Sequence, residues 1–167
     1  MHVVTSVAEL SKANAYRELN RQFSAILAGE RDGLANSANL AALLFNILPR
    51  INWAGFYFLR GRELVLGPFQ GKVACVRIAI GRGVCGTAAQ RREPVVVPDV
   101  DEFPGHIACD SASRSEIVVP LLFEQRLFGV LDIDSPELAR FDSEDTTGLT
   151  ELVNQLLRNS DFAWLGN

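Results

Sequence analysis

The sequence predicts an α+β fold, with an antiparallel sheet of about six strands that carries helices on one face and a pocket on the other. Two segments with helical periodicity come first, short segments with a period of two follow, and a helical segment closes the chain. Polar, turn-rich stretches interrupt the strand-like series between residues 67 and 115. We expect these loops to roof a pocket, which is the usual place for a small ligand.

Composition narrows the classes of partner. The 167 residues, 48% hydrophobic and 22% charged, fit one domain over residues 1–167 whose residues 1–10 form an N-terminal arm. The net charge of −4 argues against nucleic acid or an anionic membrane as partner. No apolar run approaches the roughly 20 residues that span a bilayer, and the N-terminus does not look like a secretory signal. We therefore expect a cytoplasmic protein.

Apolar residues at helical spacing predict three main helices. The first covers about residues 11–27. The second begins after the N-cap residue Asp32 and ends at Pro49, because proline cannot continue a helix. The last begins after Asp142, which we expect to form a capping box with Asp145.

Alternation of apolar and polar residues between these helices predicts short strands. A short helical piece interrupts the strands at residues 81–92, and Glu124–Gln125 forms the turn of the last hairpin. The predicted strands are residues 52–60, 64–66, 76–80, 94–97, 116–123 and 126–134.

Alternation within the strands also predicts which side chains face the pocket, because neighbouring residues point to opposite faces of a sheet. The first strand turns two aromatic residues with polar tips to the same side, and Gly55 between them leaves space. The last strand turns two acids to one side, and a third acid begins the neighbouring strand. The side chains expected to line one cavity are Trp53, Tyr57, Glu116, Asp132 and Asp134.

Each of these residues also has a purely structural interpretation. Asp134 could cap the turn that follows it, Glu116 could be a surface residue, and Trp53 and Tyr57 could be core or rim aromatics. Asp132 lies deeper among apolar residues, where an unpaired carboxylate is costly, so a functional role is favoured there. Clustered carboxylates raise one another's pKa, so one should stay protonated near neutral pH and the others should attract an ammonium group.

The only cysteines are Cys75, Cys85 and Cys109, an odd set that indicates a redox, catalytic or inert role rather than a disulfide framework. Cys85, near a predicted helix start, suits a small buried hydrophobe. Cys109 lies in a polar loop, where an inert thiol is least expected. A zinc site with His106 as fourth ligand lacks a close cysteine pair, so we expect no metal. The nearness of His106 to Cys109 makes a Cys–His hydrolase the nearest hydrolytic alternative.

Six motifs are spread along the chain: Asn52-Trp-Ala-Gly-Phe-Tyr57, Leu66-Gly-Pro-Phe-Gln-Gly71, Gly81-Arg-Gly-Val-Cys-Gly-Thr87, Phe103-Pro-Gly-His-Ile-Ala-Cys-Asp110, Ser115-Glu-Ile-Val-Val-Pro120 and Gly129-Val-Leu-Asp-Ile-Asp-Ser135. In these motifs the chain strongly resembles the free methionine-(R)-sulfoxide reductases of the GAF-domain family. The resemblance extends from about residue 11 to the last helix, and the cysteines stand in the pattern of that family. Ordinary ligand-sensing GAF domains lack these cysteines.

The resemblance implies a GAF-like fold and a cofactor-free reductase for free methionine-R-sulfoxide, with thioredoxin as reductant. It implies that Cys109 is the nucleophile, that Cys75 is the resolving thiol, and that Cys85 is a third thiol able to pair with Cys109. It further implies that Trp53 and Tyr57 hold the methyl end of the substrate. The sulfoxide oxygen and the amino group would be bound by Glu116, Asp132 and Asp134.

The chemistry of these residue types agrees with that implication. A Cys109 thiolate attacks the sulfoxide sulfur, while Glu116 or Asp132 with a raised pKa protonates the departing oxygen. The resulting sulfenic acid condenses with a second thiol to a disulfide, which thiol–disulfide exchange then reduces.

The main alternative is a GAF module that senses a small molecule or redox state without turnover. The acids, the cysteines and the expectation of one domain without an output domain argue against it. A homodimer is an assembly that the sequence leaves open.

Overall fold

A computed structural model describes residue 7 and residues 10–105 and 111–165. The predicted N-terminal arm therefore lies almost wholly outside the described residues, as do His106 and Cys109. The helices are α1 (Lys12–Leu27), α2 (Gly33–Ile47), α3 (Gly83–Arg91) and α4 (Ser143–Asn159), with 3₁₀ turns η1 (Val100–Glu102) and η2 (Ala163–Leu165). The strands are β1 (Trp53–Arg60), β2 (Glu63–Gly71), β3 (Arg77–Ala79), β4 (Val95–Val97), β5 (Ser115–Phe123) and β6 (Arg126–Ser135).

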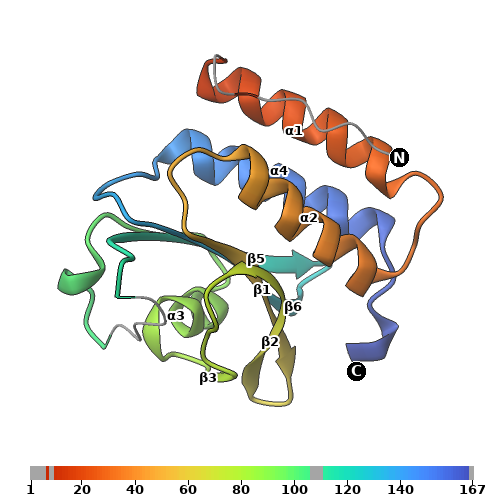
Figure 1. Cartoon of the computed structure of the whole chain (residues 1–167). Coiled ribbons are helices and arrows are strands. Elements are labelled where there is room, and N and C mark those ends of the chain that lie inside the picture. The colour runs from red at the N-terminus through yellow and green to blue at the C-terminus, as the bar shows by residue number, and fades with distance from the viewer. Residues whose placement is uncertain (1–6, 8–9, 106–110, 166–167) are drawn as a thin grey trace.

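The strands form one six-stranded sheet in the order β3-β2-β1-β6-β5-β4, and all neighbouring pairs are antiparallel. Helices α2 and α4 pack on one face, and α1 lies across them on the outside (Figure 1). The core between these helices and the sheet contains Phe56 and Phe58 of β1 together with Leu131 and Ile133 of β6. The predicted α+β architecture is thus confirmed, and the strand residues that alternate with the predicted pocket residues face the main core.

The second face of the sheet is covered by a helix as well as by loops. Helix α3 lies against this face, opposite α1, α2 and α4 (Figure 1). It can approach closely because residue 86 is glycine: a Cβ atom there would collide with the carbonyl oxygen of Ala79 at the end of β3. Within the described ranges, no helix is long and apolar enough to cross a membrane.

The predicted caps are present. The carboxylate of Asp32 accepts hydrogen bonds from the backbone N–H groups of Leu34 and Ala35 at the start of α2. Asp142 and Asp145 form a capping box at the start of α4. These short-range contacts explain why two of the helix starts could be predicted from local sequence.

Strand β2 is longer than predicted. It continues to Gly71, opposite Trp53, although it contains Pro68, which reads as a strand breaker. The register between β1 and β2 shifts between Gly55 and Tyr57, so Pro68 falls at a bulge. Strand β3 pairs with residues 63–65, so among the described residues no strand lies on the other side of this part of β2, and a missing N–H is tolerated there.

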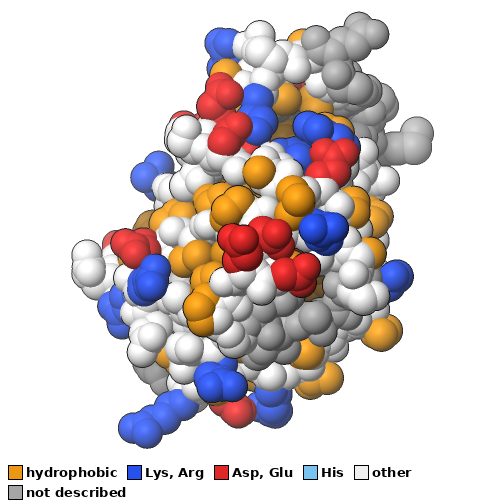
Figure 2. Space-filling view, turned by 90° about the vertical axis from the view of Figure 1, so that its left-hand side faces the viewer, with side chains coloured by type: hydrophobic (Ala, Val, Ile, Leu, Met, Phe, Trp, Pro, Cys, Tyr) orange, Lys and Arg blue, Asp and Glu red, His pale blue; other side chains and the backbone are white. Residues whose placement is uncertain are grey.

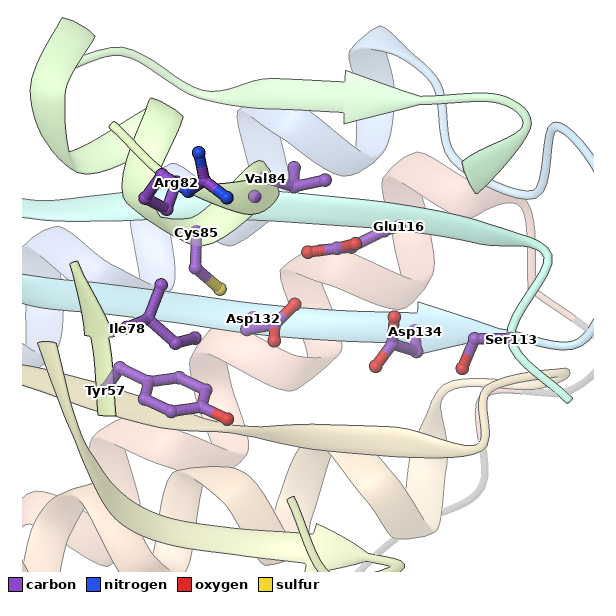
Figure 3. A pocket seen from close by; sticks show the side chains of 10 residues that line it. Tyr57, Ile78, Arg82, Val84, Cys85, Ser113, Glu116, Asp132 and Asp134 are labelled. Atoms are coloured by element: carbon purple, nitrogen blue, oxygen red, sulfur yellow. The ribbon is translucent and has the colours of Figure 1, made fainter. Parts of the chain in front are cut away.

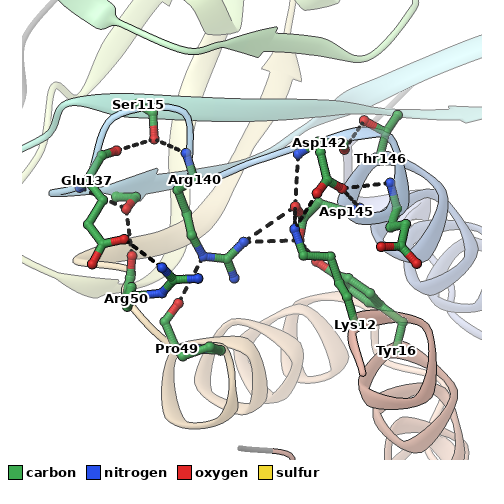
Figure 4. A network of polar contacts seen from close by, with 12 residues as sticks. Lys12, Tyr16, Pro49, Arg50, Ser115, Glu137, Arg140, Asp142, Asp145 and Thr146 are labelled. Atoms are coloured by element: carbon green, nitrogen blue, oxygen red, sulfur yellow. Dashed lines mark hydrogen bonds and ion pairs between the residues drawn. The ribbon is translucent and has the colours of Figure 1, made fainter. Parts of the chain in front are cut away.

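A buried polar network connects α1, the start of α4 and the segment that follows α2 (Figure 4). The side chain of Asp145 is fully buried and accepts hydrogen bonds from Lys12 Nζ at 2.6 Å, Tyr16 Oη at 2.8 Å and Arg140 Nη1 at 3.2 Å. Arg140 Nε also donates to the carbonyl oxygen of Pro49. The network therefore holds α1, the start of α4 and the end of α2 together through one carboxylate.

Candidate active site

A small cavity of about 20 Å³, which is room for little more than one water-sized sphere, lies on the second face of the sheet below the first turn of α3 (Figure 3). Strands β1, β3, β5 and β6 supply its other walls, together with the segment before β5. Its lining residues are Tyr57, Ile78, Arg82, Gly83, Val84, Cys85, Ser113, Glu116, Asp132 and Asp134. Four of the five residues predicted to share one cavity therefore do so.

The strand register explains how the three acids meet. Asp132 and Asp134 alternate with core residues on β6, so both point to the second face. Glu116 of β5 stands directly opposite Asp134 in the antiparallel ladder. Like charges at directly opposed positions destabilise a sheet, so this arrangement favours function over stability. Glu116 is only 5% exposed, which rules out its interpretation as a surface residue.

Burial and mutual proximity raise the pKa of two of the acids. The pKa of Glu116 lies well above its usual range because of burial and then the charge of Asp134. The pKa of Asp132 is raised well above its usual range, first by burial and then by the charge of Glu116. The predicted elevation is therefore confirmed for these two groups, and the pair can hold a proton near neutral pH.

Cys85 belongs to the same cluster. Its side chain faces the cavity beside Asp132 (Figure 3). Burial, followed by the charges of Asp132 and Glu116, raises the pKa of the Cys85 thiol well above its usual range. Cys85 is therefore more than a buried hydrophobe, because its neutral thiol contacts the acids.

Trp53 lies beside the cavity rather than in its lining. Its ring stacks on Phe69 at a centroid distance of 5.3 Å and on Tyr57 at 6.0 Å. Its indole N–H donates to the carbonyl oxygen of Lys72 at 3.0 Å. The space left by Gly55 is not available to a ligand, because a Cβ atom there would collide with Phe69. Trp53 thus supports the position of Tyr57 in this closed arrangement.

Tyr57 connects the cavity to the segment that carries Cys75. Its hydroxyl donates a hydrogen bond of 3.0 Å to the carbonyl oxygen of Cys75. Cys75 is half-buried and precedes β3. The geometry between Cys75 and Cys109 lies outside the described residues, as does any contact of His106.

Several lining residues were not predicted. Arg82 and Val84 flank Cys85 in the Gly81–Thr87 motif, so their place in the sequence was a usable signal. Ser113 had no such signal. It reaches the cavity from the segment before β5, where its hydroxyl accepts a hydrogen bond of 3.1 Å from Asn52 Nδ2.

Charge on the outside of the molecule is also unevenly distributed. In Figure 2, acidic side chains gather at the centre of the face shown, beside a basic side chain and hydrophobic surface. This agrees with the net charge of −4.

Comparison with known proteins identifies the family. The model of the GAF domain matches residues 15–158. The chain belongs to the GAF-domain family. It is 56% identical over 147 residues to the free methionine-R-sulfoxide reductase of Escherichia coli strain K12, covering 88% of this chain and 89% of that protein. It is 39% identical over 163 residues to the free methionine-R-sulfoxide reductase of Saccharomyces cerevisiae, covering 93% and 91%.

A solved structure supports the same placement. The X-ray structure of the free methionine-R-sulfoxide reductase of Neisseria meningitidis in complex with its substrate aligns with a TM-score of 0.90 at 49% identity. The alignment covers 95% of each chain. The resemblance seen in the motifs is therefore confirmed over nearly the whole chain.

Proposed function

We propose that this protein reduces free methionine-R-sulfoxide to methionine. The observation that carries the proposal is the buried pair of Glu116 and Asp132, whose raised pKa values suit a proton donor that faces the cavity. Sulfoxide reduction needs such a donor, because the oxygen must be protonated as it leaves sulfur. The named activity of relatives that cover most of the chain supports the same reaction.

In this proposal Cys109 supplies the electrons. Its thiolate attacks the sulfoxide sulfur, and Glu116 or Asp132 delivers the proton to the oxygen. The oxygen is transferred to Cys109 as a sulfenic acid, and methionine leaves with its sulfur reduced to the thioether. A second thiol then displaces hydroxide, which leaves as water, and forms a disulfide. Cys75 is proposed as the resolving thiol, and Cys85 is the other thiol available for this step. Thioredoxin is proposed as the reductant of the disulfide.

The acids and aromatics also suit the substrate. The ammonium group of free methionine sulfoxide is a natural partner for Asp134 and for whichever of Glu116 and Asp132 is ionised. Tyr57 and Trp53 offer apolar ring surface for the methyl end. Because the described cavity holds only about 20 Å³, substrate binding must be accompanied by an opening of its walls.

The test is methionine release from free methionine-R-sulfoxide with a thioredoxin system. We expect turnover in the wild type and none in Cys109→Ser, with the S epimer as a matched control substrate that stays unreduced. Turnover in Cys109→Ser would move the nucleophile to another thiol. A folded wild-type protein without turnover would contradict the proposal and favour the non-catalytic sensor.

A further inference from the structure

The cavity groups a thiol with two carboxyl groups in a way that suits a metal ion as well as a substrate. Cys85, Glu116 and Asp132 are all buried, and each offers a ligand atom within 4.8 Å of the other two. They come from α3, β5 and β6, so three elements of the fold fix their spacing (Figure 3). The sequence argued only against a zinc site made of the three cysteines and His106. The structure assembles a different, carboxylate-rich set.

A second observation points to a ligand. Asp132 is 7% exposed, and although its carboxyl group is hydrogen-bonded to Cys85 and Glu116, its Oδ1 atom has no hydrogen-bond partner among the described residues. A buried carboxylate oxygen without a partner is costly, so a ligand that binds it is favoured. The carboxyl group of Asp132 points into the cavity between Cys85 and Asp134 (Figure 3).

The size of the cavity limits the ligand. At about 20 Å³, it accepts one water-sized body without rearrangement of its walls. The space itself suits a single ion around which the ligands close, whereas a molecule as large as an amino acid does not fit.

We propose that the reduced, substrate-free protein binds one Zn²⁺ ion through Cys85 Sγ and carboxylate oxygens of Glu116 and Asp132. Thiolate and carboxylate are both common ligands of Zn²⁺, whereas Mg²⁺ and Ca²⁺ prefer sites made of oxygen alone. Tetrahedral zinc with ordinary bond lengths holds such atoms about 3.4–3.6 Å apart, so separations of up to 4.8 Å require a contraction of roughly 1 Å.

The consequence for activity rests on the proposed function. Because Glu116 and Asp132 are the proposed proton donors and substrate ligands, the ion and the substrate would compete. Zn²⁺ would then be a competitive inhibitor of the reduced enzyme, and a high substrate concentration would protect it.

The binding test uses Co²⁺ alone as a spectroscopic substitute for Zn²⁺, added to the full-length protein after thiol reduction and removal of the reductant. We expect a thiolate-to-metal charge-transfer band that saturates at one Co²⁺ per chain and disappears on addition of Zn²⁺. The band should be lost in Cys85→Ser and kept in Cys75→Ser, since Cys75 does not belong to this cluster. In Asp132→Asn the Co²⁺ affinity should fall at least tenfold.

Two outcomes would overturn the inference. One is a folded, reduced protein that binds neither Co²⁺ nor Zn²⁺. The other is a charge-transfer band that survives in Cys85→Ser but is lost in Cys109→Ser, which would place the metal on another thiol. These readouts do not depend on turnover. Methionine release without metal binding would refute this inference alone, and metal binding without methionine release would refute the proposed function alone.

Discussion

The protein buries acidic groups in two places and treats them in opposite ways. In the helical layer, Asp145 is fully buried and is surrounded by Lys12, Arg140 and the hydroxyl of Tyr16. In the cavity, the causes that raise the pKa of Glu116 are burial, first, and then the negative charge of Asp134. For Asp132 they are burial and the charge of Glu116, and its Oδ1 lacks a hydrogen-bond partner among the described residues.

This difference separates a structural carboxylate from the acids that are proposed to be functional. The side chains of Lys12, Tyr16 and Arg140 all donate hydrogen bonds to Asp145, so one carboxylate joins the helices. The cavity acids are held close to one another instead, which costs stability, and in the proposed function they supply the proton and bind the ammonium group. Burial alone would not distinguish the two sites, whereas the charges of the neighbours do.

The largest effect is expected from removal of the structural charge. Asp145→Asn leaves the buried guanidinium of Arg140 without its counter-charge and should lower the free energy of unfolding by about 3–5 kcal/mol. Urea denaturation measures this change. Asp142→Asn is the matched control, because asparagine still caps a helix and the Asp142–Lys12 pair is partly exposed. A smaller loss for Asp145→Asn than for Asp142→Asn would contradict the comparison.

Substitution of an acid in the cavity should change the free energy of unfolding in the opposite direction. Asp132→Asn removes an acid whose ionisation is penalised by burial in the folded state but not in the unfolded state, and it should raise the free energy of unfolding by about 0.5–2 kcal/mol at neutral pH. The same variant should lose at least ~100-fold in kcat/KM for free methionine-R-sulfoxide, the range of a lost proton donor. Denaturation and steady-state kinetics measure the two changes. A variant that is both destabilised and fully active would show that Asp132 is an ordinary structural acid.

The raised pKa of Asp132 also predicts how the stability of the protein depends on pH. The pKa of Asp132 is higher in the folded than in the unfolded state, so wild-type stability decreases as pH rises from about 4 through the folded-state pKa. The Asp132→Asn variant lacks this pH-dependent contribution to stability. The stability difference between variant and wild type should therefore be near zero below about pH 4 and grow towards neutral pH. A difference that stays constant from pH 4 to pH 8 would argue against a raised pKa.

An effect smaller than that of Asp145→Asn is expected from the loss of two tyrosine hydroxyls. Tyr16 donates to the charged Asp145, whereas Tyr57 donates to the neutral carbonyl of Cys75. Tyr16→Phe should cost about 1.5–3 kcal/mol of unfolding free energy and Tyr57→Phe about 1 kcal/mol, because hydrogen bonds to charged groups are stronger. Thermal and urea denaturation of both variants measure the difference. Equal losses would mean that the charge of Asp145 adds nothing to its bond with Tyr16.

Much of the fold could be predicted because its signals are local. The caps at Asp32 and Asp142 and the alternation along β1 and β6 depend on residues a few positions apart. The presence of the acids in one cavity could also be predicted, since alternation places Asp132 and Asp134 on one face.

The features that escaped prediction depend on contacts between distant segments. The capping role of Asp145 was readable from sequence, but its pairing with Lys12, more than a hundred residues away, was not. The close approach of Gly86 to Ala79 and the filling of the space at Gly55 by Phe69 likewise require the assembled sheet. Ser113 reaches the cavity only because the chain before β5 passes Asn52.

The hairpin of β5 and β6 carries all three acids of the cavity within residues 116–134. It closes through Glu124 and Gln125, both of which have positive φ angles, as a tight two-residue turn requires. The roof is built from separate segments, including α3 and the chain before β5. Insertions or substitutions in the roof can therefore change which molecules enter while leaving the spacing of the acids intact. In the proposed function, substrate selection and proton transfer are therefore assigned to different segments of the chain.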